Sequence, residues 1–333
     1  MPESDTQVAI ACQGGGAHTA FTAGALKRLL PAVEADHDLV GLSGTSGGAL
    51  CAVTAWYGLL TGGPEQAAEL LDAVWDDVAT DSWRAQLTNT WLGWYTRLEK
   101  SGAPVPQVSP SRIPGRPAQR WFRRLVERHI RFDQFDDLVT DTSPTVTIAT
   151  VNVNSGAFER YSDSNITSER MVASAAVPHL FVPVELDGDW HWDGLLSQNP
   201  PVRQFLTDDG PKPDELWVIQ INPQTREDRP TSLGEIADRR NELAGNLSLN
   251  QELHFIEAVN DWIEAGHLPD DYKYVEVRCL TLDRELDYAS KFERDPDFIR
   301  ELREYGEAQT DKFLAGELDD ACPAMRDEDA EPG

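Results

Sequence analysis

Apolar residues along the first 60 positions fall into two patterns that alternate with glycine-rich turns. Residues 7–12 and 39–43 are short apolar runs, a pattern that predicts buried strands. Residues 17–30 and 49–60 are longer, apolar-rich segments that predict helices. Glycines separate each strand from the helix that follows it. Two successive strand–turn–helix units indicate an α/β protein built on a sheet.

The rest of the chain continues this alternation. Further strands are predicted at residues 145–151, 158–161, 216–221 and 274–279, with a hairpin turn at Asp187-Gly188. Further helices are predicted at residues 64–78, 82–98, 118–131, 243–265 and 298–314. The chain has no internal repeats and no break in composition that divides it.

We therefore expect a single domain over residues 1–315. Its core is predicted at about residues 7–205, and a helical C-terminal extension at about residues 230–315. Residues 316–333 are acidic and contain proline, so we expect a disordered tail.

Acidic residues outnumber basic ones by about two to one. The sequence holds 57 Asp and Glu against 29 Lys and Arg, which gives a net charge of −28. Because such a chain repels phosphate backbones, we expect no nucleic-acid partner. Two interpretations of this composition stay open: an acidic protein in which Arg replaces Lys, or a surface adapted to molar salt, where self-repulsion is screened.

The sequence also bears on compartment. No run of about 18 apolar residues is present, so we expect no membrane-spanning helix. The acidic start lacks the features of a signal peptide, and we expect a cytoplasmic protein. Cys12, Cys51, Cys279 and Cys322 have no metal-ligand spacing, so we expect reduced thiols, with the first two as small core residues.

Residues 44–48 match the pattern GxSxG, with Ser46 at the centre. A serine on a sharp turn between a strand and a helix has a strained backbone, and side chains in place of Gly44 and Gly48 would clash there. The match lies between a predicted strand and a predicted helix, which is the context that a nucleophilic serine requires. The alternative is a glycine-rich turn with a solvent-facing serine.

Gly14, Gly15 and Gly16 also stand between a predicted strand and a predicted helix. Bare glycine N–H groups can hold the oxygen of a tetrahedral intermediate in an oxyanion hole. A nucleotide-binding turn is a second interpretation, but Thr19 stands where the dinucleotide pattern needs glycine. Tight packing of strand against helix is the third. This segment alone leaves the choice between packing and function open.

A nucleophilic serine needs a base, and the sequence offers two kinds. His254 or His267 could complete the chain order Ser, Asp, His. A carboxylate is the alternative, because Asp193 precedes Gly194 at the end of an apolar strand, a position that suits a catalytic loop. An ordinary Asp-Gly turn is the simpler interpretation of the same two residues.

Four motifs together resemble the patatin-like phospholipase family. They are, in order, the glycines at 14–16, the GxSxG match at 44–48, residues 173–178 (Ala-Ser-Ala-Ala-Val-Pro) and Asp193-Gly194. The resemblance covers about residues 7–205 and implies a three-layer α/β/α sandwich with a mainly parallel central sheet. Residues 296–314 also look like the C-terminal helix of bacterial members.

The resemblance implies hydrolysis of acyl esters by a Ser–Asp dyad without a catalytic histidine. By motif, Ser46 is the nucleophile and Asp193 the base. The N–H groups of the glycines at 14–16 form the oxyanion hole, and Gly44 and Gly48 shape the nucleophile turn. No metal and no organic cofactor is implied.

The chain departs from the family pattern at three positions. His18 stands where the family often has Arg, Thr19 where it often has Gly, and Leu195 where it often has Gly or Ala. The first departure leaves open what charge assists at the oxyanion. The bulk of Leu195 is expected to narrow or reshape the pocket. None of the three removes a dyad group.

The family resemblance implies a lipid or polyester surface as the partner. Aromatic residues stand near arginines in one region: Trp83, Trp91, Trp94, Tyr95, Trp121 and Phe122 near Arg120, Arg123 and Arg124. Such a region either holds the protein on an apolar interface or lines the core.

Three hypotheses of function follow. The first is an acyl-ester hydrolase on lipids or, by resemblance to patatin-like depolymerases of haloarchaea, on intracellular polyhydroxyalkanoate granules. An uncharged granule would tolerate a strongly acidic enzyme better than an anionic membrane. The second is a non-catalytic lipid- or granule-coat protein on the same scaffold. The third is a Ser–His–Asp hydrolase.

Overall fold

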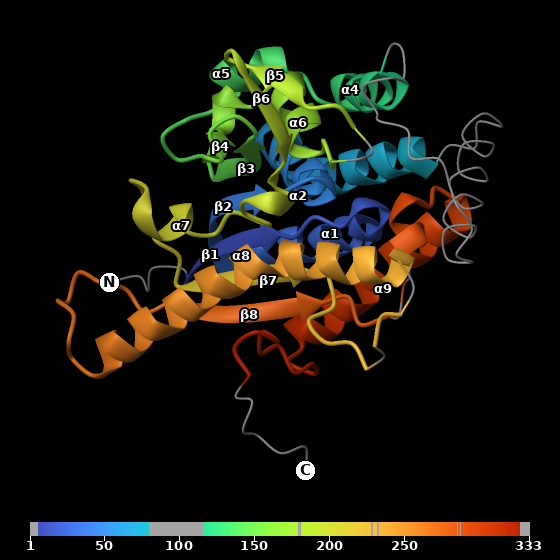
Figure 1. The fold of residues 1–333 in the computed structure, drawn as a ribbon. Helices are drawn as coiled ribbons and strands as arrows, with labels where there is room; N and C mark the ends of the chain where they lie inside the picture. Colours follow the sequence, from blue (N-terminus) through green and yellow to red (C-terminus); the bar gives the residue numbers. More distant parts are fainter. Residues whose placement is uncertain are drawn as a thin grey trace.

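The computed structural model describes residues 6–79, 116–178, 181–227, 229–231, 233–284, 286 and 288–326 (Figure 1). Its centre is an eight-stranded sheet in the order β5-β6-β3-β2-β1-β7-β8, with β4 also paired to β3. The strands are β1 (Thr6–Cys12), β2 (His37–Gly44), β3 (Thr145–Asn152), β4 (Phe158–Ser162), β5 (Val184–Leu186), β6 (Asp189–Asp193), β7 (Glu215–Gln220) and β8 (Glu276–Thr281).

The sheet is mainly parallel. Strands β3, β2, β1, β7 and β8 pair in parallel, while β4 and β6 run antiparallel to β3. The predicted hairpin turn is confirmed between β5 and β6, where Asp187 and Gly188 have φ of 53° and 98°. Two positive φ angles in succession are what a two-residue hairpin turn of the favoured twist requires.

Helices cover the sheet on both faces. They are α1 (Ala20–Asp36), α2 (Gly47–Ala79), α4 (Pro117–His129), α5 (Phe135–Leu138), α6 (Ser168–Ser174), α7 (Gln204–Thr207), α8 (Leu233–Glu264) and α9 (Pro296–Leu314). Short 3₁₀ helices are η1 (Gly16–Thr19), η3 (Phe132–Gln134), η4 (Asp163–Asn165), η5 (Gly194–Leu196) and η6 (Tyr288–Phe292).

Alternation along β1 separates two hydrophobic cores. Val8 and Ile10 point to one face of the sheet, where they pack with residues of α1, α2 and α9. Ala9 and Ala11 point to the other face, where they pack with residues of α8 and the segment around α7. Figure 1 shows α8 running along this second face. The expected three-layer α/β/α sandwich with a mainly parallel sheet is therefore confirmed.

The predicted elements also hold in detail. Each strand and helix predicted within the described residues has a counterpart, and the helices predicted at residues 49–60 and 64–78 correspond to the two halves of α2. These halves meet at a kink where Gly62 and Gly63 have non-helical backbone angles. None of the helices in the described part of the chain is both long enough and apolar enough to cross a membrane.

The cysteines depart from expectation at one pair. Cys12 and Cys51 are buried thiols, as predicted. Cys279 and Cys322 form a disulfide, so the expectation of four reduced thiols is wrong for this pair. They lie 43 residues apart and match no spacing motif. Only the fold brings the segment after α9 alongside β8.

Part of the acidic tail packs against that strand. The Cys279 N–H donates to the Asp320 carbonyl oxygen at 2.6 Å, and the Asp320 carboxylate pairs with Arg278, also at 2.6 Å. Cys322 is 1% exposed. The disordered tail predicted from residue 316 therefore needs correction, because the structure places residues 316–326 on the fold; residues 327–333 lie outside the described part.

Some predictions of the aromatic region lie outside the described residues. These are the helix at residues 82–98 and the four aromatic residues Trp83, Trp91, Trp94 and Tyr95. Within the described part, Trp121 and Phe122 on α4 are half-buried and pack against the core, and the Arg294 guanidinium lies 3.7 Å from the centroid of the Trp121 ring.

Helices α1 and α9 approach so closely that only glycine fits where they touch. A Cβ on Gly24 would overlap the Arg303 carbonyl, and a Cβ on Gly306 would overlap the Phe21 carbonyl. We expect Gly306→Ala to lower the free energy of unfolding by about 1–3 kcal/mol, since added atoms in a tight core force the backbones apart.

Urea denaturation would measure this loss. Glu301→Ala is the matched control, because Glu301 is exposed on the same helix. Equal stability of Gly306→Ala and Glu301→Ala would contradict the close approach of the two helices.

Candidate active site

The two glycine-rich turns lie side by side because β1 and β2 are parallel neighbours. Cys12 and Gly44, the last residues of the two strands, are register partners. The turn after β1 leads into η1 and α1, and the turn after β2 leads into α2 (Figure 1). The carboxyl ends of adjacent strands in an open α/β sheet are a common place for a ligand site.

Ser46 occupies a sharp turn between β2 and α2. Its φ is 57°, a left-handed conformation that non-glycine residues rarely adopt. A Cβ on Gly44 would overlap the Gly48 carbonyl, and a Cβ on Gly48 would overlap the Cys12 carbonyl. Glycine is thus required at both predicted positions. The Ser46 N–H donates to Ser174 Oγ at 3.2 Å, which ties the turn to α6.

Asp193 ends β6 and is fully buried. Its Oδ1 accepts a hydrogen bond from the Leu195 N–H at 2.8 Å, and its own N–H donates to the Ala176 carbonyl. Oδ2 is buried and accepts no hydrogen bond from any residue that the structure describes. Burial raises the pKa of Asp193 to about 7, against the opposing effects of the Leu195 N–H and then the Ser46 hydroxyl.

The structure thus places Ser46 next to Asp193. The hydroxyl is close enough to lower the pKa of the carboxyl, although the pair does not meet regular hydrogen-bond geometry. Such contacts are often long before substrate binds. Gly194 helps to bring the two together, since a Cβ there would meet the Ala149 carbonyl oxygen at 2.6 Å and Thr45 Cγ2 at 2.9 Å.

The glycines at 14–16 border the same point. A Cβ built on Gly14 would lie 3.1 Å from Ser46 Cβ. The Gly14 N–H donates to Asn199 Oδ1 at 2.7 Å, so it is already engaged. The N–H groups of Gly15 and Gly16 donate to no other residue in the described part of the chain. Of the three amides predicted for an oxyanion hole, that of Gly14 is thus engaged within the protein.

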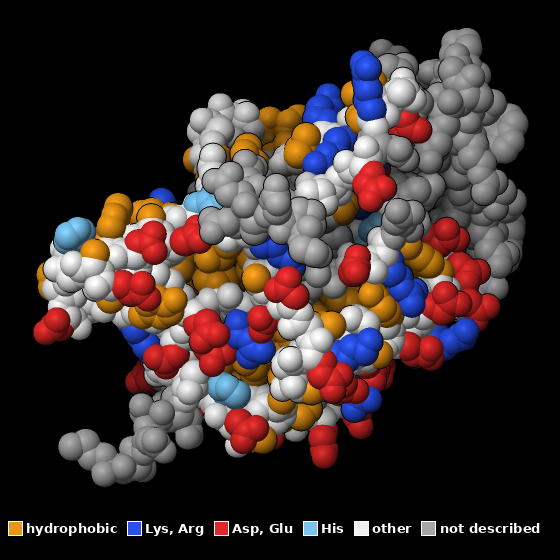
Figure 2. Space-filling view, turned by 90° about the horizontal axis from the view of Figure 1, so that it is seen from below, with side chains coloured by type: hydrophobic (Ala, Val, Ile, Leu, Met, Phe, Trp, Pro, Cys, Tyr) orange, Lys and Arg blue, Asp and Glu red, His pale blue; other side chains and the backbone are white. Residues whose placement is uncertain are grey.

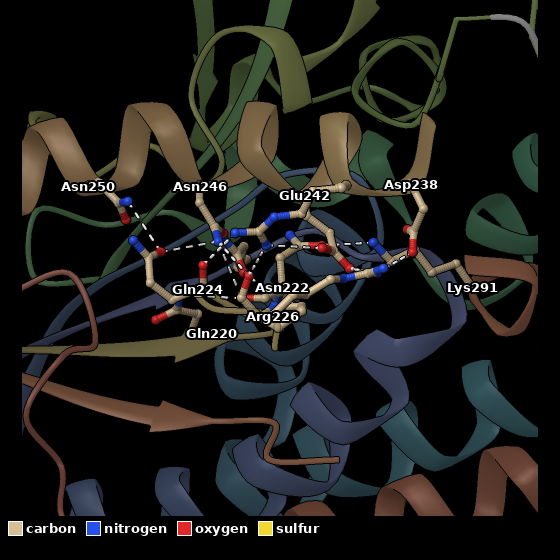
Figure 3. Close-up of polar contacts among 12 residues, drawn as sticks. Gln220, Asn222, Gln224, Arg226, Asp238, Glu242, Asn246, Asn250 and Lys291 are labelled. Carbon is tan, nitrogen blue, oxygen red and sulfur yellow. Dashed lines mark hydrogen bonds and ion pairs between the residues drawn. The ribbon is translucent and has the colours of Figure 1, made fainter. Parts of the chain in front are cut away.

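A buried polar network supports this loop, and the sequence motifs did not reveal it. Gln13 Oε1 accepts from the Ile221 and Asn222 N–H groups, both at 2.8 Å, and its Nε2 donates to Asn246 Oδ1 at 2.8 Å. Asn222 Nδ2 donates to the Gly14 carbonyl oxygen at 3.1 Å. Figure 3 shows the network extending from α8 to the segment that follows β7.

The imidazoles for which the structure gives contacts bond to other groups. His191 contacts Thr150 Oγ1, His254 contacts the Ala324 carbonyl, and His18 contacts Ser290 Oγ. No hydrogen bond within the described part of the chain joins a histidine to Ser46 or Asp193; His179 lies outside that part. The same described residues contain no group of three His, Cys, Asp or Glu side chains that could hold a metal ion.

Comparison with protein families finds a match over much of the chain. The profile of a family described as patatin-like phospholipase matches residues 10–206, which is more than half of the chain. Among solved structures, the chain is similar to VipD from Legionella pneumophila, with 13% identity and a TM-score of 0.47 over 94% of this chain and 67% of that one. No curated protein matches the chain.

Burial of the Asp193 carboxyl predicts a pH-dependent loss of stability. Because its folded pKa lies above the unfolded value of 3.8, the group favours the folded state at low pH, and this contribution is lost as pH rises toward about 7. Relative to Asp193→Asn, which cannot ionise, wild type should lose about 3 kcal/mol of unfolding free energy between pH 5 and pH 8.

Urea unfolding of both proteins at the two pH values, in one salt concentration, would measure the difference. Comparing the two proteins cancels the pH dependence of the other carboxylates. A difference that stays constant from pH 5 to pH 8 would show that Asp193 has an ordinary pKa.

Proposed function

This chain belongs to the patatin-like phospholipase family, and from that premise we propose that it is a serine acyl-ester hydrolase with Ser46 as nucleophile and Asp193 as general base. The family supports hydrolysis of lipid acyl esters. The observation that carries the residue assignment is the pairing of the strained Ser46 turn with a buried carboxyl whose Oδ2 has no hydrogen-bond partner in the described part of the chain.

The proposed reaction begins with proton transfer. Asp193 Oδ2 takes the Ser46 proton while Oγ attacks the ester carbonyl carbon, so a C–O bond forms and the carbonyl oxygen becomes an oxyanion. The alcohol then leaves with the proton held on Asp193, which yields an acyl-enzyme. Asp193 next takes a proton from water while the water oxygen attacks the acyl carbon and forms a second oxyanion. When the C–Oγ bond breaks, Asp193 returns this proton to Oγ, which releases the carboxylic acid and restores both Ser46 and the carboxylate.

The pKa of Asp193 suits this role. A general base works best when its pKa is near the operating pH, and burial brings this carboxyl to about 7. The Leu195 N–H holds Oδ1, which leaves Oδ2 for the hydroxyl. The base is thus strengthened by desolvation and oriented by one backbone contact.

We assign the oxyanion hole to the N–H groups of Gly15 and Gly16. Gly14 supports them, since its own N–H is bonded to Asn199. Gly16 has a φ of 61°, and a side chain there would overlap the Lys291 carbonyl. Removing one such donor typically costs about 10²–10³ in kcat.

Exposed apolar side chains support an apolar substrate surface. Ile236, Leu243 and Leu247 are exposed at helical spacing on one side of α8, and Leu196 is exposed on η5. η5 follows Asp193 directly and packs on α8, where Leu195 contacts Gly245. Acidic side chains are spread over the face seen in Figure 2, with hydrophobic ones between them. Such a surface suits an uncharged ester aggregate better than an anionic bilayer.

The more specific role that we propose within this class is depolymerisation of an intracellular polyhydroxyalkanoate granule. Its polyester is uncharged and is cleaved by the same acyl transfer. The acidic surface, which we propose to be adapted to molar salt, is compatible with an uncharged partner and not with phosphate-rich ones.

We expect Ser46→Ala and Asp193→Asn each to lower kcat on a p-nitrophenyl ester by about 10⁴-fold or more, because each removes a reacting group. Both variants should fail to react, or react very slowly, with a fluorophosphonate probe. His254→Ala and His267→Ala are the matched controls and should retain wild-type turnover.

Other outcomes separate the alternatives. If a histidine variant loses turnover while the Asp193→Asn variant keeps it, a Ser–His–Asp hydrolase would be favoured. Absence of both turnover and Ser46 labelling in wild type would favour a non-catalytic coat protein.

A substrate panel tests the specific role. We expect wild type, but not Ser46→Ala, to release 3-hydroxy acid from amorphous polyester granules at high salt. Phospholipid vesicles and short p-nitrophenyl esters are the comparison substrates. Release of fatty acid from vesicles without release of 3-hydroxy acid from granules would overturn the depolymerase role and leave the lipid acyl hydrolase in place.

A further inference from the structure

Lys291 lies beside the glycine loop and is part of the buried network of Figure 3. It belongs to η6, which packs against η1. Its backbone carbonyl lies against Gly16, where a Cβ would overlap it. Its side chain extends to Asn222, since Nζ donates to Asn222 Oδ1 at 2.9 Å. The backbone of Lys291 therefore contacts the glycine loop directly, and its amine contacts Asn222, which is hydrogen-bonded to that loop.

Asn222 connects Lys291 to the glycine loop by hydrogen bonds. Its side-chain amide accepts from Lys291 through Oδ1 and donates through Nδ2 to the Gly14 carbonyl oxygen at 3.1 Å. The Asn222 backbone is fixed as well, because its N–H donates to Gln13 Oε1 at 2.8 Å. The side chain is 3% exposed overall and so has little freedom to turn away.

The Gly14 carbonyl and the Gly15 N–H belong to one peptide group. This peptide is trans, and in a planar trans peptide the N–H points opposite to the C=O. A hydrogen bond that fixes the carbonyl on one side therefore fixes the direction of the N–H on the other. Asn222 thus fixes the direction of the Gly15 N–H, which we assign to the oxyanion hole.

The same chain also polarises that amide. Each hydrogen bond in a series strengthens the next in a low-dielectric interior. Donation from Lys291 Nζ to the Asn222 side-chain carbonyl makes the Asn222 Nδ2–H a better donor. Donation from Nδ2 to the Gly14 carbonyl in turn makes the Gly15 N–H a better donor. A stronger Gly15 N–H donor stabilises negative charge where the oxyanion forms.

The charged groups around Lys291 maintain its place in the network. Burial is the largest effect on the pKa of Lys291 and lowers it below the ordinary value. Arg226 also lowers this pKa, while Asp238 and Glu242 on α8 raise it. Arg226 in turn pairs with both Asp238 and Glu242. The two carboxylates of this cluster thus oppose the effect of burial on the amine.

We propose that Lys291 and Asn222 are positioning residues that aim and polarise the Gly15 N–H toward the oxyanion, through two amide groups connected in series. This inference rests on the proposed function, in which the Gly15 N–H is an oxyanion donor. Neither residue touches the substrate. Their effect is on the transition state, where charge develops, and not on ester binding.

The test compares Lys291→Met and Asn222→Asp in the full chain. Methionine keeps the length of the side chain without the amine, and a carboxylate in place of Asn222 still accepts from Lys291 but cannot donate to Gly14. Lys273→Met is the control, because Lys273 is also hydrogen-bonded and ion-paired, but with residues at the start of β1 and β7.

We expect each variant to lower kcat on p-nitrophenyl butyrate by about tenfold, less than the loss of a direct donor, with KM unchanged. The double variant should be no slower than Asn222→Asp alone, since both residues act through one chain of hydrogen bonds. A kcat for Lys291→Met equal to that of Lys273→Met would overturn the proposal, and so would multiplicative losses in the double variant. If Lys291→Met does not fold, Asn222→Asp alone against Lys273→Met decides it.

Hydrogen exchange provides a measurement that needs no turnover. We expect the amides of residues 13–17 to exchange faster in Lys291→Met and Asn222→Asp than in wild type and Lys273→Met. Unchanged exchange would overturn the positioning role. Wild type without any Ser46-dependent turnover would instead refute the proposed function, and the exchange comparison would still show whether Lys291 holds the loop.

Discussion

The parallel pairing of β1 with β2 ends with Cys12 opposite Gly44, and the arrangement of the site depends on that register. It makes the turns after the two strands interlock. Gly48 of one turn lies against the Cys12 carbonyl, and Gly14 of the other lies against the Thr45 carbonyl and Ser46. A shift of the register by one residue would move Ser46 away from the glycine loop, and side chains at these glycines would force the turns apart. The hydrophobic cores on both faces of the sheet maintain this register.

The second constraint is the cost of burying the Asp193 carboxyl, which pairs with no cation among the described residues. The pKa of Asp193 is raised chiefly by burial, and its stabilising contacts are an amide and a hydroxyl. In the proposed reaction, the proton that leaves Ser46 neutralises this carboxylate while a new negative charge forms at the ester oxygen. One negative charge therefore moves from a poorly solvated oxygen to one that faces backbone amides. The free energy stored in the buried carboxylate favours that movement.

Much of the fold could be predicted from the sequence, because its signals are local. Strand, glycine turn and helix follow one another within a few residues around Ser46, and the hairpin turn at Asp187 has a two-residue signature. The supporting residues give no such signal. Asn199 and Asn222 reach Gly14 from about 200 positions away, and Lys291 reaches Asn222 from a further segment. A lone Asn or Lys in a loop has no pattern that distinguishes it before the fold is known.

The same limit applies to two further features. The sequence does not reveal that the Gly14 N–H is already engaged, because its acceptor, Asn199, lies 185 positions away along the chain. It also cannot pair Cys279 with Cys322, since their proximity depends on how the chain returns after α9.

That return of the chain has a consequence for association between molecules. β8 is the last strand in the sheet order, and an exposed last strand offers unpaired N–H and C=O groups to a strand of another molecule. Here the Asp320 carbonyl oxygen accepts a hydrogen bond from the Cys279 N–H of β8. The disulfide between Cys279 and Cys322 holds the segment around Asp320 in place. At the opposite end, β5 has only three residues. The two end strands of this order, β5 and β8, are therefore poor templates for open-ended growth into fibres.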